Sequence, residues 1–399
     1  MAVSAVGRGV TFARGFTAGA VAAGVKHAGT ARLDLALIVS DRPAAAGAVF
    51  TTNQVIAAPC VLSRRHASGG PLRAIVVNSG NANACTGVQG EQDALAMAAA
   101  AAARVGCVAT EIAVASTGVI GVPLPMERIA PALATVQTSL GGWDDASRAI
   151  MTTDTRPKVV EREIALGGGT VRIGGIAKGA GMIHPNMATL LVFVTTDAAI
   201  DAARLQGAVA AAARHSFNAI SIDGDTSTND TLLVLANGAS GVTIGEAELT
   251  EFTAGLSGIC LDLARAVVAD GEGVTKVFEV QVSGAETEAD AERAARTITT
   301  SNLVKTAING GDPNWGRILA AAGRSGARVD ASRASVRIGG ITVFATGSLR
   351  PVDDAAIRAV FGRAEIAIEV DLGLGDGVAR AWGTDLSAEY VRINADYTT

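Results

Sequence analysis

The spacing of apolar residues predicts a chain in which short strands alternate with helices. Over residues 33–39, leucines alternate with smaller or polar neighbours, the two-residue period of a strand with one buried face. Residues 190–194 are instead continuously apolar, which is typical of a strand buried on both faces and also of a segment of buried helix. The same reasoning predicts strands at 74–77 and 112–115, a hairpin over 159–176 that turns at 167–169, and helices over 89–105, 125–140, 143–151, 198–216, 246–268 and 317–323.

A glycine-containing loop that begins at Lys178 leads directly into the continuous apolar run. Within it, Pro185 fixes its own φ and favours an extended conformation at His184. Thr189 immediately precedes the predicted strand at 190–194. Cleavage of the bond between Ala188 and Thr189 would give Thr189 a free α-amino group with an ordinary pKa of about 7.7 to 8.0, beside its own hydroxyl. The sequence therefore suggests a self-cleaving chain in which Thr189 supplies both nucleophile and base.

This loop resembles the self-cleavage segment of the ornithine acetyltransferase family, bifunctional enzymes of arginine biosynthesis that are also called glutamate N-acetyltransferases. The resemblance covers nearly the whole chain. Its motifs occur in the family's order and comprise NSGNANACTG at 78–87, STGVIG at 116–121, TDT at 153–155, DGEG at 270–273, GDPNWGR at 311–317 and INADYTT at 393–399. The resemblance implies an α/β fold, the αββα sandwich of self-cleaving N-terminal-nucleophile type that the family shares with certain aminopeptidases. It divides the chain into an alpha chain, 1–188, and a beta chain, 189–399, that share one core.

The resemblance also implies roles for individual residues. Thr189 is expected to carry the acetyl group, while Thr117 and Gly118 form an oxyanion hole that stabilises the developing negative charge. The carboxylate of Glu272 suits an ammonium group on the substrate. The expected substrate-binding positions are Thr155, Lys178, Thr189, Glu272, Asn394 and Thr399.

The reaction that the resemblance implies moves the acetyl group from N2-acetyl-L-ornithine to L-glutamate through acetyl-Thr189. It needs no metal and no cofactor, and acetyl-CoA is expected as a second acetyl donor. The two pieces of the chain are expected to associate as a heterotetramer of two alpha and two beta chains. A monofunctional ornithine acetyltransferase, a related self-processing aminopeptidase or amidohydrolase, and a non-enzymatic binding protein are the alternatives.

Taken without the family, several of these residues allow plainer interpretations. The asparagines of the 78–83 run fit turns, and a Thr-Gly pair such as Thr117 and Gly118 after a strand is more often a turn. Most lysines are solvated, so Lys178 alone carries little weight, and Glu272 between glycines fits a solvated turn.

Two further features invite other chemistry. Asp223 and Asp225 have the spacing of an EF-hand calcium loop, but Thr228 stands where its turn glycine belongs and Val234 where its closing glutamate belongs. We therefore expect a turn in this loop.

The histidines His184 and His215 are the alternative bases. A packing or C-terminal charge role fits His215 at the end of its predicted helix, and the free amine of Thr189 removes the need for an imidazole. Neither histidine is included in the expected catalytic set.

Composition excludes several classes of protein. The net charge is −5 and no lysine or arginine block occurs, so neither nucleic acid nor an anionic membrane surface is an expected partner. The apolar stretch 94–103 is too short to span a bilayer and is expected to be a packed helix. Four cysteines without Cys-x-x-Cys spacing argue against a zinc site and for reduced thiols in a cytoplasmic protein, and no clear export signal is present.

Overall fold

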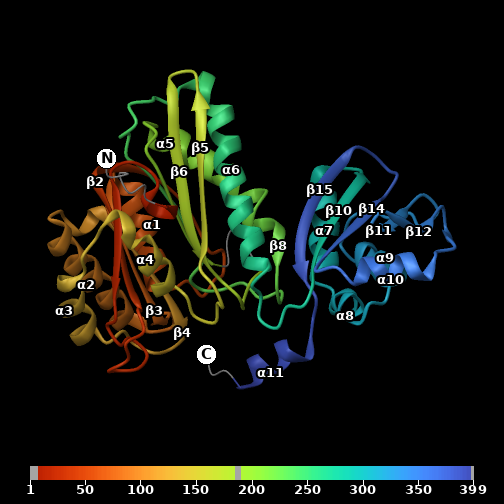
Figure 1. Cartoon of the computed structure of the whole chain (residues 1–399), viewed down its shortest axis with the longest axis horizontal. Coiled ribbons are helices and arrows are strands. Elements are labelled where there is room, and N and C mark those ends of the chain that lie inside the picture. Colours follow the sequence, from red (N-terminus) through yellow and green to blue (C-terminus); the bar gives the residue numbers. More distant parts are fainter. Residues whose placement is uncertain (1–7, 185–189, 397–399) are drawn as a thin grey trace, which may run out of the picture.

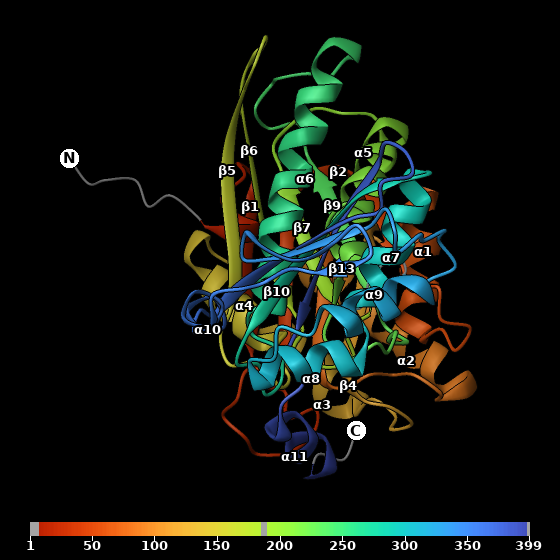
Figure 2. The ribbon, with the colours of Figure 1, turned by 90° about the vertical axis from the view of Figure 1, so that its right-hand side faces the viewer.

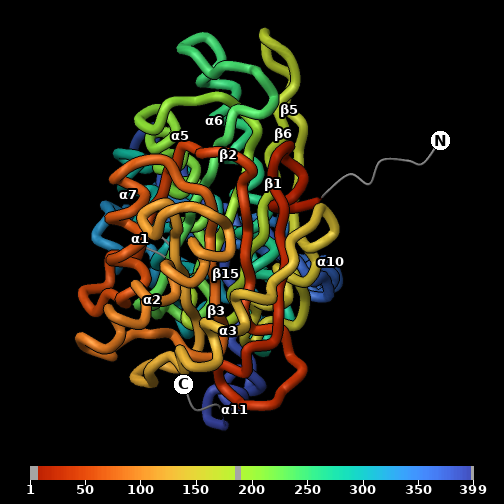
Figure 3. The backbone as a smooth tube through the Cα atoms, turned by 90° about the vertical axis from the view of Figure 1, so that its left-hand side faces the viewer, coloured from red at the N-terminus to blue at the C-terminus, as the bar shows by residue number. Residues whose placement is uncertain are grey.

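The computed structural model describes residues 8–184 and 190–396. Figure 1 shows a larger body built mainly from the first two thirds of the chain beside a smaller C-terminal body. Figures 1 and 3 both place the last helix, α11 (Ala388–Asp396), at one end of the larger body. The C-terminal segment thus returns to the larger body, which is built mainly from the first two thirds of the chain.

The larger body contains strands in the order β4-β3-β2-β9-β7-β6-β5, and β1 pairs with β2. The 16-residue strand β2 joins its two halves, because residues 35–39 pair with β3 whereas residues 45–50 pair with β9. The strand bounds are β1 (Phe16–Val21), β2 (Leu35–Phe50), β3 (Leu72–Asn81), β4 (Ile112–Val119), β5 (Lys158–Leu166), β6 (Gly169–Lys178), β7 (Leu191–Thr196) and β9 (Thr231–Ala236).

These two halves pack face to face between two layers of helices. On β3, Val77 belongs to the core between the halves, whereas its neighbour Val76 packs under the outer helices. On β7, Phe193 points into the same central core and Val192 packs under the helices of the opposite side. The outer helices are α1 (Ala58–Gly69), α2 (Gly87–Val105) and α3 (Met126–Thr135) on one side and α5 (Ala202–Arg214) and α6 (Glu246–Val268) on the other, with α4 (Trp143–Ala149) beside the central core.

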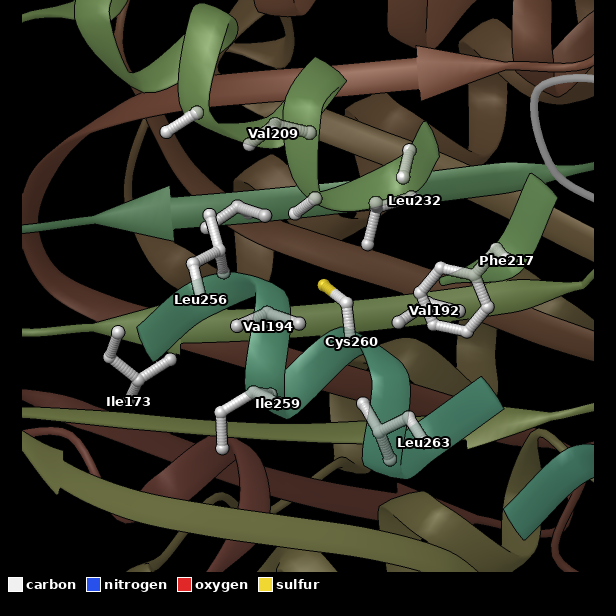
Figure 4. Close-up of a cluster of buried hydrophobic side chains, with 14 of the residues drawn as sticks. Ile173, Val192, Val194, Val209, Phe217, Leu232, Leu256, Ile259, Cys260 and Leu263 are labelled. Carbon is white, nitrogen blue, oxygen red and sulfur yellow. The ribbon is translucent and has the colours of Figure 1, made fainter. Parts of the chain in front are cut away.

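This layering confirms the expected αββα arrangement. It also explains the continuous apolar run before Thr196, since every residue of β7 is buried. Figure 4 shows Val192, Val194 and Leu232 on the sheet face that α6 covers with Leu256 and Cys260, among other residues.

The smaller body has its own sheet and its own core. Its strand order is β13-β12-β11-β14-β10-β15-β8, and Figure 2 shows it facing the viewer. Its elements are β8 (Ile220–Ser221), β10 (Val277–Ala285), α7 (Glu288–Thr299), α8 (Asn302–Gly310), α9 (Trp315–Gly323), β11 (Ser335–Ile338), β12 (Ile341–Ala345), β13 (Ser348–Leu349), α10 (Asp354–Phe361), β14 (Glu365–Asp371) and β15 (Gly377–Thr384). The apolar pattern did not reveal this second sheet.

Several predicted boundaries are wrong. The strands predicted at 33–39 and 74–77 extend to Phe50 and Asn81, and three other boundaries shift for a local reason. The strand predicted to end at 115 continues to Val119, because β3 and β4 stay paired through Gly80 and Gly118. The helix predicted to reach 140 ends at Thr135, since Ser139 instead exchanges backbone hydrogen bonds with Ala18. The helix predicted from 198 begins at Ala202, because the side chain of Asp201 caps its first turn by accepting a hydrogen bond from the amide of Arg204.

Other expectations agree with the structure. The helices α2, α6 and α9 and the hairpin β5–β6 lie where the pattern predicted them. All four cysteines are free. Within the described ranges, no helix is both long and apolar enough to cross a membrane.

Truncating β7 in the central core should destabilise the protein strongly. We expect Phe193→Ala to lower the free energy of unfolding by about 3 to 5 kcal/mol, because Phe193 is 0% exposed and the deletion leaves a cavity. The control Leu303→Ala, at a side chain that is 61% exposed, should cost less than about 0.5 kcal/mol. Denaturant unfolding measures both, and equal losses would contradict the layering.

Candidate active site

A cavity of about 120 Å³ lies where the ends of β4 and β6 meet the start of β7. Its walls come from parts of the chain that are far apart in sequence. They consist of Ala82, Thr117, Gly118, Ile120, Thr152, Thr153, Lys178, Gly181, Met182, Ile183, Leu190, Leu191, Ser227, Thr228, Asn229, Asp230, Glu272 and Asn394.

Five of the residues singled out in the sequence line this cavity together: Thr117, Gly118, Lys178, Glu272 and Asn394. Thr155 is not among the lining residues; its side chain turns away to the carboxylate of Asp270. Ala188, Thr189 and Thr399 lie outside the described residues. Leu190, the residue that follows Thr189, does line the cavity.

Lys178 is buried at the end of β6 with its ammonium group between two threonines. Its Nζ atom donates to Thr152 Oγ1 at 2.8 Å and to Thr117 Oγ1 at 3.2 Å. Burial lowers the pKa of Lys178, and the negative charge of Asp154 opposes this shift. A cation is thereby held directly beside the threonine that the oxyanion-hole interpretation uses.

The position of Gly118 can hold only glycine. Its φ is +129°, in the range that residues with a side chain rarely adopt, and an added Cβ would lie 2.2 Å from the carbonyl oxygen of Gly80. Gly118 lines the cavity, and no side chain of its own covers its backbone there. A bound group can therefore approach this backbone closely, which suits an oxyanion hole.

A buried cluster of charges, formed by Lys158 with Asp154 and Asp270, lies close to the residues that line the cavity. Lys158 Nζ lies 2.5 Å from Asp154 Oδ1 and 2.6 Å from Asp270 Oδ2. Asp154 also accepts hydrogen bonds from the amides of Thr152, at 3.0 Å, and Gly179, at 2.6 Å. Burial alone would raise the pKa of Asp154, but the charges of Lys178 and Lys158 and the hydrogen bonds from Lys158 and the Gly179 amide bring it to about 2.

Sequence reasoning missed this cluster, although it quoted the two motifs that supply the aspartates. Nothing in their spacing indicated that they meet, since Asp154 and Asp270 are joined through Lys158 and through the hydrogen bonds of Thr155 to Asp270. The cluster fixes the segments that carry Thr152, Lys178 and Glu272 relative to one another.

Glu272 is held over the cavity by the glycine loop and by α11. Its backbone amide donates to the carbonyl of Ala180 at 2.8 Å, and Asn394 Nδ2 donates to its Oε2 atom at 2.9 Å. A Cβ at Gly181 would meet the Glu272 carboxylate at 2.4 Å, so glycine there makes room for it. The C-terminal segment is tied to the cavity through Asn394, as the sequence suggested.

His184 is fixed as a neutral imidazole at the end of the glycine loop. Arg296 Nη2 lies 3.0 Å from its Nε2 atom, and because a guanidinium only donates, Nε2 accepts and Nδ1 carries the proton toward Ser221 Oγ, 3.2 Å away. Burial, followed by the charge of Arg296, lowers the pKa of His184 to about 4. A histidine held in this way anchors the loop.

The acidic loop that follows β8 also anchors the glycine loop. The carboxylate of Asp223 accepts hydrogen bonds from the amides of Met182, at 2.6 Å, and Ile183, at 2.8 Å. Its oxygens are therefore engaged by backbone groups, as in a turn.

Among the described residues, the only group with ligand atoms close enough to hold a metal ion is His215 with Glu288 and Glu292, within 4.8 Å of one another. This group lies at the surface, and Arg214 forms ion pairs with both glutamates. None of its three residues lines the cavity, and we do not assign a metal site to it.

Asn229 and Asp230 are lining residues that sequence reasoning did not single out. Asn229 Nδ2 donates to the carbonyls of Ala82 and Ser116 at 2.6 and 2.9 Å and so links the strands on either side of the cavity. Only the pairing of β7 with β9 brings this loop to the cavity, and the sequence pattern does not specify that pairing.

Comparison with known proteins shows the family to which the chain is similar. The model of the ArgJ family matches residues 17–399. The arginine biosynthesis bifunctional protein ArgJ of Symbiobacterium thermophilum is 49% identical over 396 residues, covering 98% of each chain. The protein of the same name from Geobacter sulfurreducens is 50% identical over 392 residues, covering 97% of this chain and 99% of its own.

Solved structures are also similar to this chain. The crystal structure of the arginine biosynthesis bifunctional protein argJ from Bacillus halodurans is 42% identical and has a TM-score of 0.50. The match covers 51% of this chain and 98% of the solved chain.

Removing the carboxylate of Asp154 should destabilise the protein while leaving its packing volume unchanged. We expect Asp154→Asn to cost about 3 kcal/mol of unfolding free energy, because Lys158 loses one buried partner. The exposed pair of Arg162 with Asp262 offers a matched control, and Asp262→Asn should cost less than about 1 kcal/mol.

The pH dependence of unfolding checks the same interaction. Because folding lowers the pKa of Asp154 to about 2, its contribution is present above the ordinary value of 3.8 and is lost as the pH falls toward 2. Denaturant unfolding of wild type and Asp154→Asn should therefore converge over that range, and a difference that stays constant with pH would contradict the charge assignment.

Proposed function

Because the chain belongs to the ArgJ family, we propose that it transfers the acetyl group from N2-acetyl-L-ornithine to L-glutamate in arginine biosynthesis. The observation that carries the proposal is the cavity at the start of β7. It brings together a threonine and glycine suited to an oxyanion hole, Thr117 and Gly118, a buried cation, Lys178, and a carboxylate, Glu272.

The nucleophile of this proposal is Thr189, freed by cleavage of its bond to Ala188. Support comes from Leu190, which lines the cavity and is covalently bonded to Thr189. The solved Bacillus halodurans chain gives further support, since nearly all of it matches only about half of this chain, as expected for a protein made of two pieces.

Two pieces cut at this bond would stay together. The second piece starts two residues before β7 and places that strand between β6 of the first piece and its own β9. The core around Val192 likewise combines residues from both sides of the cut. Separation would expose this core to water, which is strongly unfavourable.

The acetyl transfer proceeds in two similar steps. The α-amine of Thr189 accepts the proton of its hydroxyl while the oxygen attacks the acetyl carbonyl, and Thr117 and Gly118 donate hydrogen bonds to the oxyanion. The amine then gives the proton to the departing nitrogen, so ornithine leaves and acetyl-Thr189 remains. Glutamate attacks this ester by the reverse sequence, and its nitrogen carries the acetyl group away.

The remaining parts of the proposal concern binding and assembly. Glu272 lies over the cavity beside Asn394 and faces the ammonium group of the ornithine or glutamate substrate. Thr155 and Thr399 complete the proposed substrate contacts. Exchange of one amide for another needs no redox or metal cofactor. The two pieces form a heterotetramer in the cytoplasm, and acetyl-CoA serves as a second acetyl donor.

Isotope transfer tests the main activity. With N2-acetylornithine labelled in its acetyl group, the wild type should yield labelled N-acetylglutamate, Thr189→Ser should retain part of the rate because it keeps a hydroxyl, and Thr189→Ala should yield none. Mass spectrometry of the products measures the partition. Label appearing as free acetate in the presence of saturating glutamate would contradict a transferase and favour a hydrolase.

A separate incubation tests the second donor. The wild type supplied with acetyl-CoA and glutamate should form N-acetylglutamate, and Thr189→Ala should not. If the wild type forms none above the blank while it still uses N2-acetylornithine, the enzyme is monofunctional.

A further inference from the structure

Asp230 is a buried carboxylate at the cavity that the mechanism above leaves unused. Asp230 is one of the residues that line the cavity, it is only 1% exposed, and both of its carboxylate oxygens are buried. Neither of its carboxylate oxygens has a hydrogen-bond partner within the described parts of the chain, although Thr51 and Ser227 lie nearby. Burial of this group without a partner raises its pKa well above the ordinary value. An unpaired buried carboxyl group of this kind is destabilising unless another group supplies the missing hydrogen bonds.

The sheet places Asp230 beside the start of β7. Asp230 immediately precedes β9, and the parallel pairing of β7 with β9 sets Leu191 opposite Thr231. The amide of Thr231 donates to the carbonyl of Leu190 at 2.9 Å, so Asp230 lies at the level of Leu190. On the other edge of β7, Lys178 of β6 pairs with Leu191. One acidic and one basic residue therefore flank the entrance to this strand.

Lys178 does not supply the missing partner of Asp230. Its ammonium group donates to the hydroxyls of Thr117 and Thr152, and no ion pair joins it to Asp230 among the described residues. The other titratable groups that face Asp230 or its loop are the thiol of Cys60, on α1, and the carboxylate of Glu272, across the cavity. Neither is a cation. The charge of Lys178 favours the ionised form of Asp230, but among the described residues no cation donates a hydrogen bond to its carboxylate.

We propose that Asp230 is the positioning residue for the α-amino group of Thr189, holding that amine toward the hydroxyl and stabilising the ammonium group that forms when the amine takes the hydroxyl proton. This inference rests on the proposed function, because the amine exists only after the chain is cut. The new amino group belongs to the residue bonded to Leu190, which is the residue at the level of Asp230. The arrangement of nucleophile, base and a third group that orients the base is then complete.

The proton balance of this step is simple. As the bond from Thr189 Oγ to the acetyl carbon forms, the hydroxyl proton passes to the α-amine, and the resulting ammonium group faces the carboxylate of Asp230. When the bond from the acetyl carbon to the ornithine nitrogen breaks, the ammonium group returns that proton to the leaving nitrogen. Asp230 neither gains nor loses a proton during the cycle.

The pH profile of acetyl transfer by Asp230→Asn tests the inference. Without the carboxylate, the ammonium form of Thr189 is less favoured, so the acidic limb of kcat/KM for N2-acetylornithine should move to lower pH by about one unit. We expect kcat to fall about 100-fold while KM changes less than about threefold. Asp93→Asn is the matched control, because Asp93 is also buried but lies outside the cavity, and its acidic limb should stay in place.

A second variant tests the carboxylate itself. Asp230→Ala leaves space for a small carboxylate, so added formate should restore acetyl transfer by the cut protein at least tenfold, whereas formate should leave Asp93→Ala unchanged. An acidic limb that does not move in a cut Asp230→Asn protein would overturn the inference, as would the absence of formate rescue. An inactive wild type with an intact chain would instead overturn the proposed function itself, so the two failures are distinguishable.

Discussion

The strand β7 is buried on both faces and hydrogen-bonded along both edges, and the rest of the site depends on this constraint. Its register with β6 and β9 fixes where Leu190 lies, and therefore where the chain enters the cavity. A strand held in this way cannot slip by one residue without turning Val192 and Phe193 toward the wrong cores. The position of the residue before it is thus determined by the core and not by the loop that carries it.

The groups around this entrance are held by buried polar contacts. The carboxylates of Asp154 and Asp270 bind Lys158, and Asp154 also fixes the backbone at Gly179. Asp223 and His184 fix the far end of the same loop. Because buried charges and amides of this kind need their partners, the loop before the proposed cut is defined at both of its ends. Such preorganisation is what an oxyanion hole and an N-terminal base require.

Much of this architecture could be predicted from the sequence, and the exceptions have physical causes. The apolar run at 190–194 indicated a strand buried on both faces, and the motifs indicated Thr117, Gly118, Lys178, Glu272 and Asn394, which the fold brings to one cavity. The second sheet was missed although β10 and β14 carry a two-residue alternation of buried and more exposed positions, and its strand order follows long-range pairing that no local pattern specifies. Asp230 was missed for the same reason, since only the pairing of β7 with β9 brings it to the cavity. Thr155 contacts Asp270 instead of lining the cavity, a contact that no local pattern encodes.

The central claim is that Thr189 becomes the first residue of its own polypeptide. Denaturing mass spectrometry of the purified, active protein, combined with N-terminal sequencing, tests this most directly. Two fragments should appear, one ending at Ala188 and one whose first residue is Thr189 with an unblocked amine. A single uncut chain of 399 residues that transfers acetyl groups at the full rate would contradict the claim.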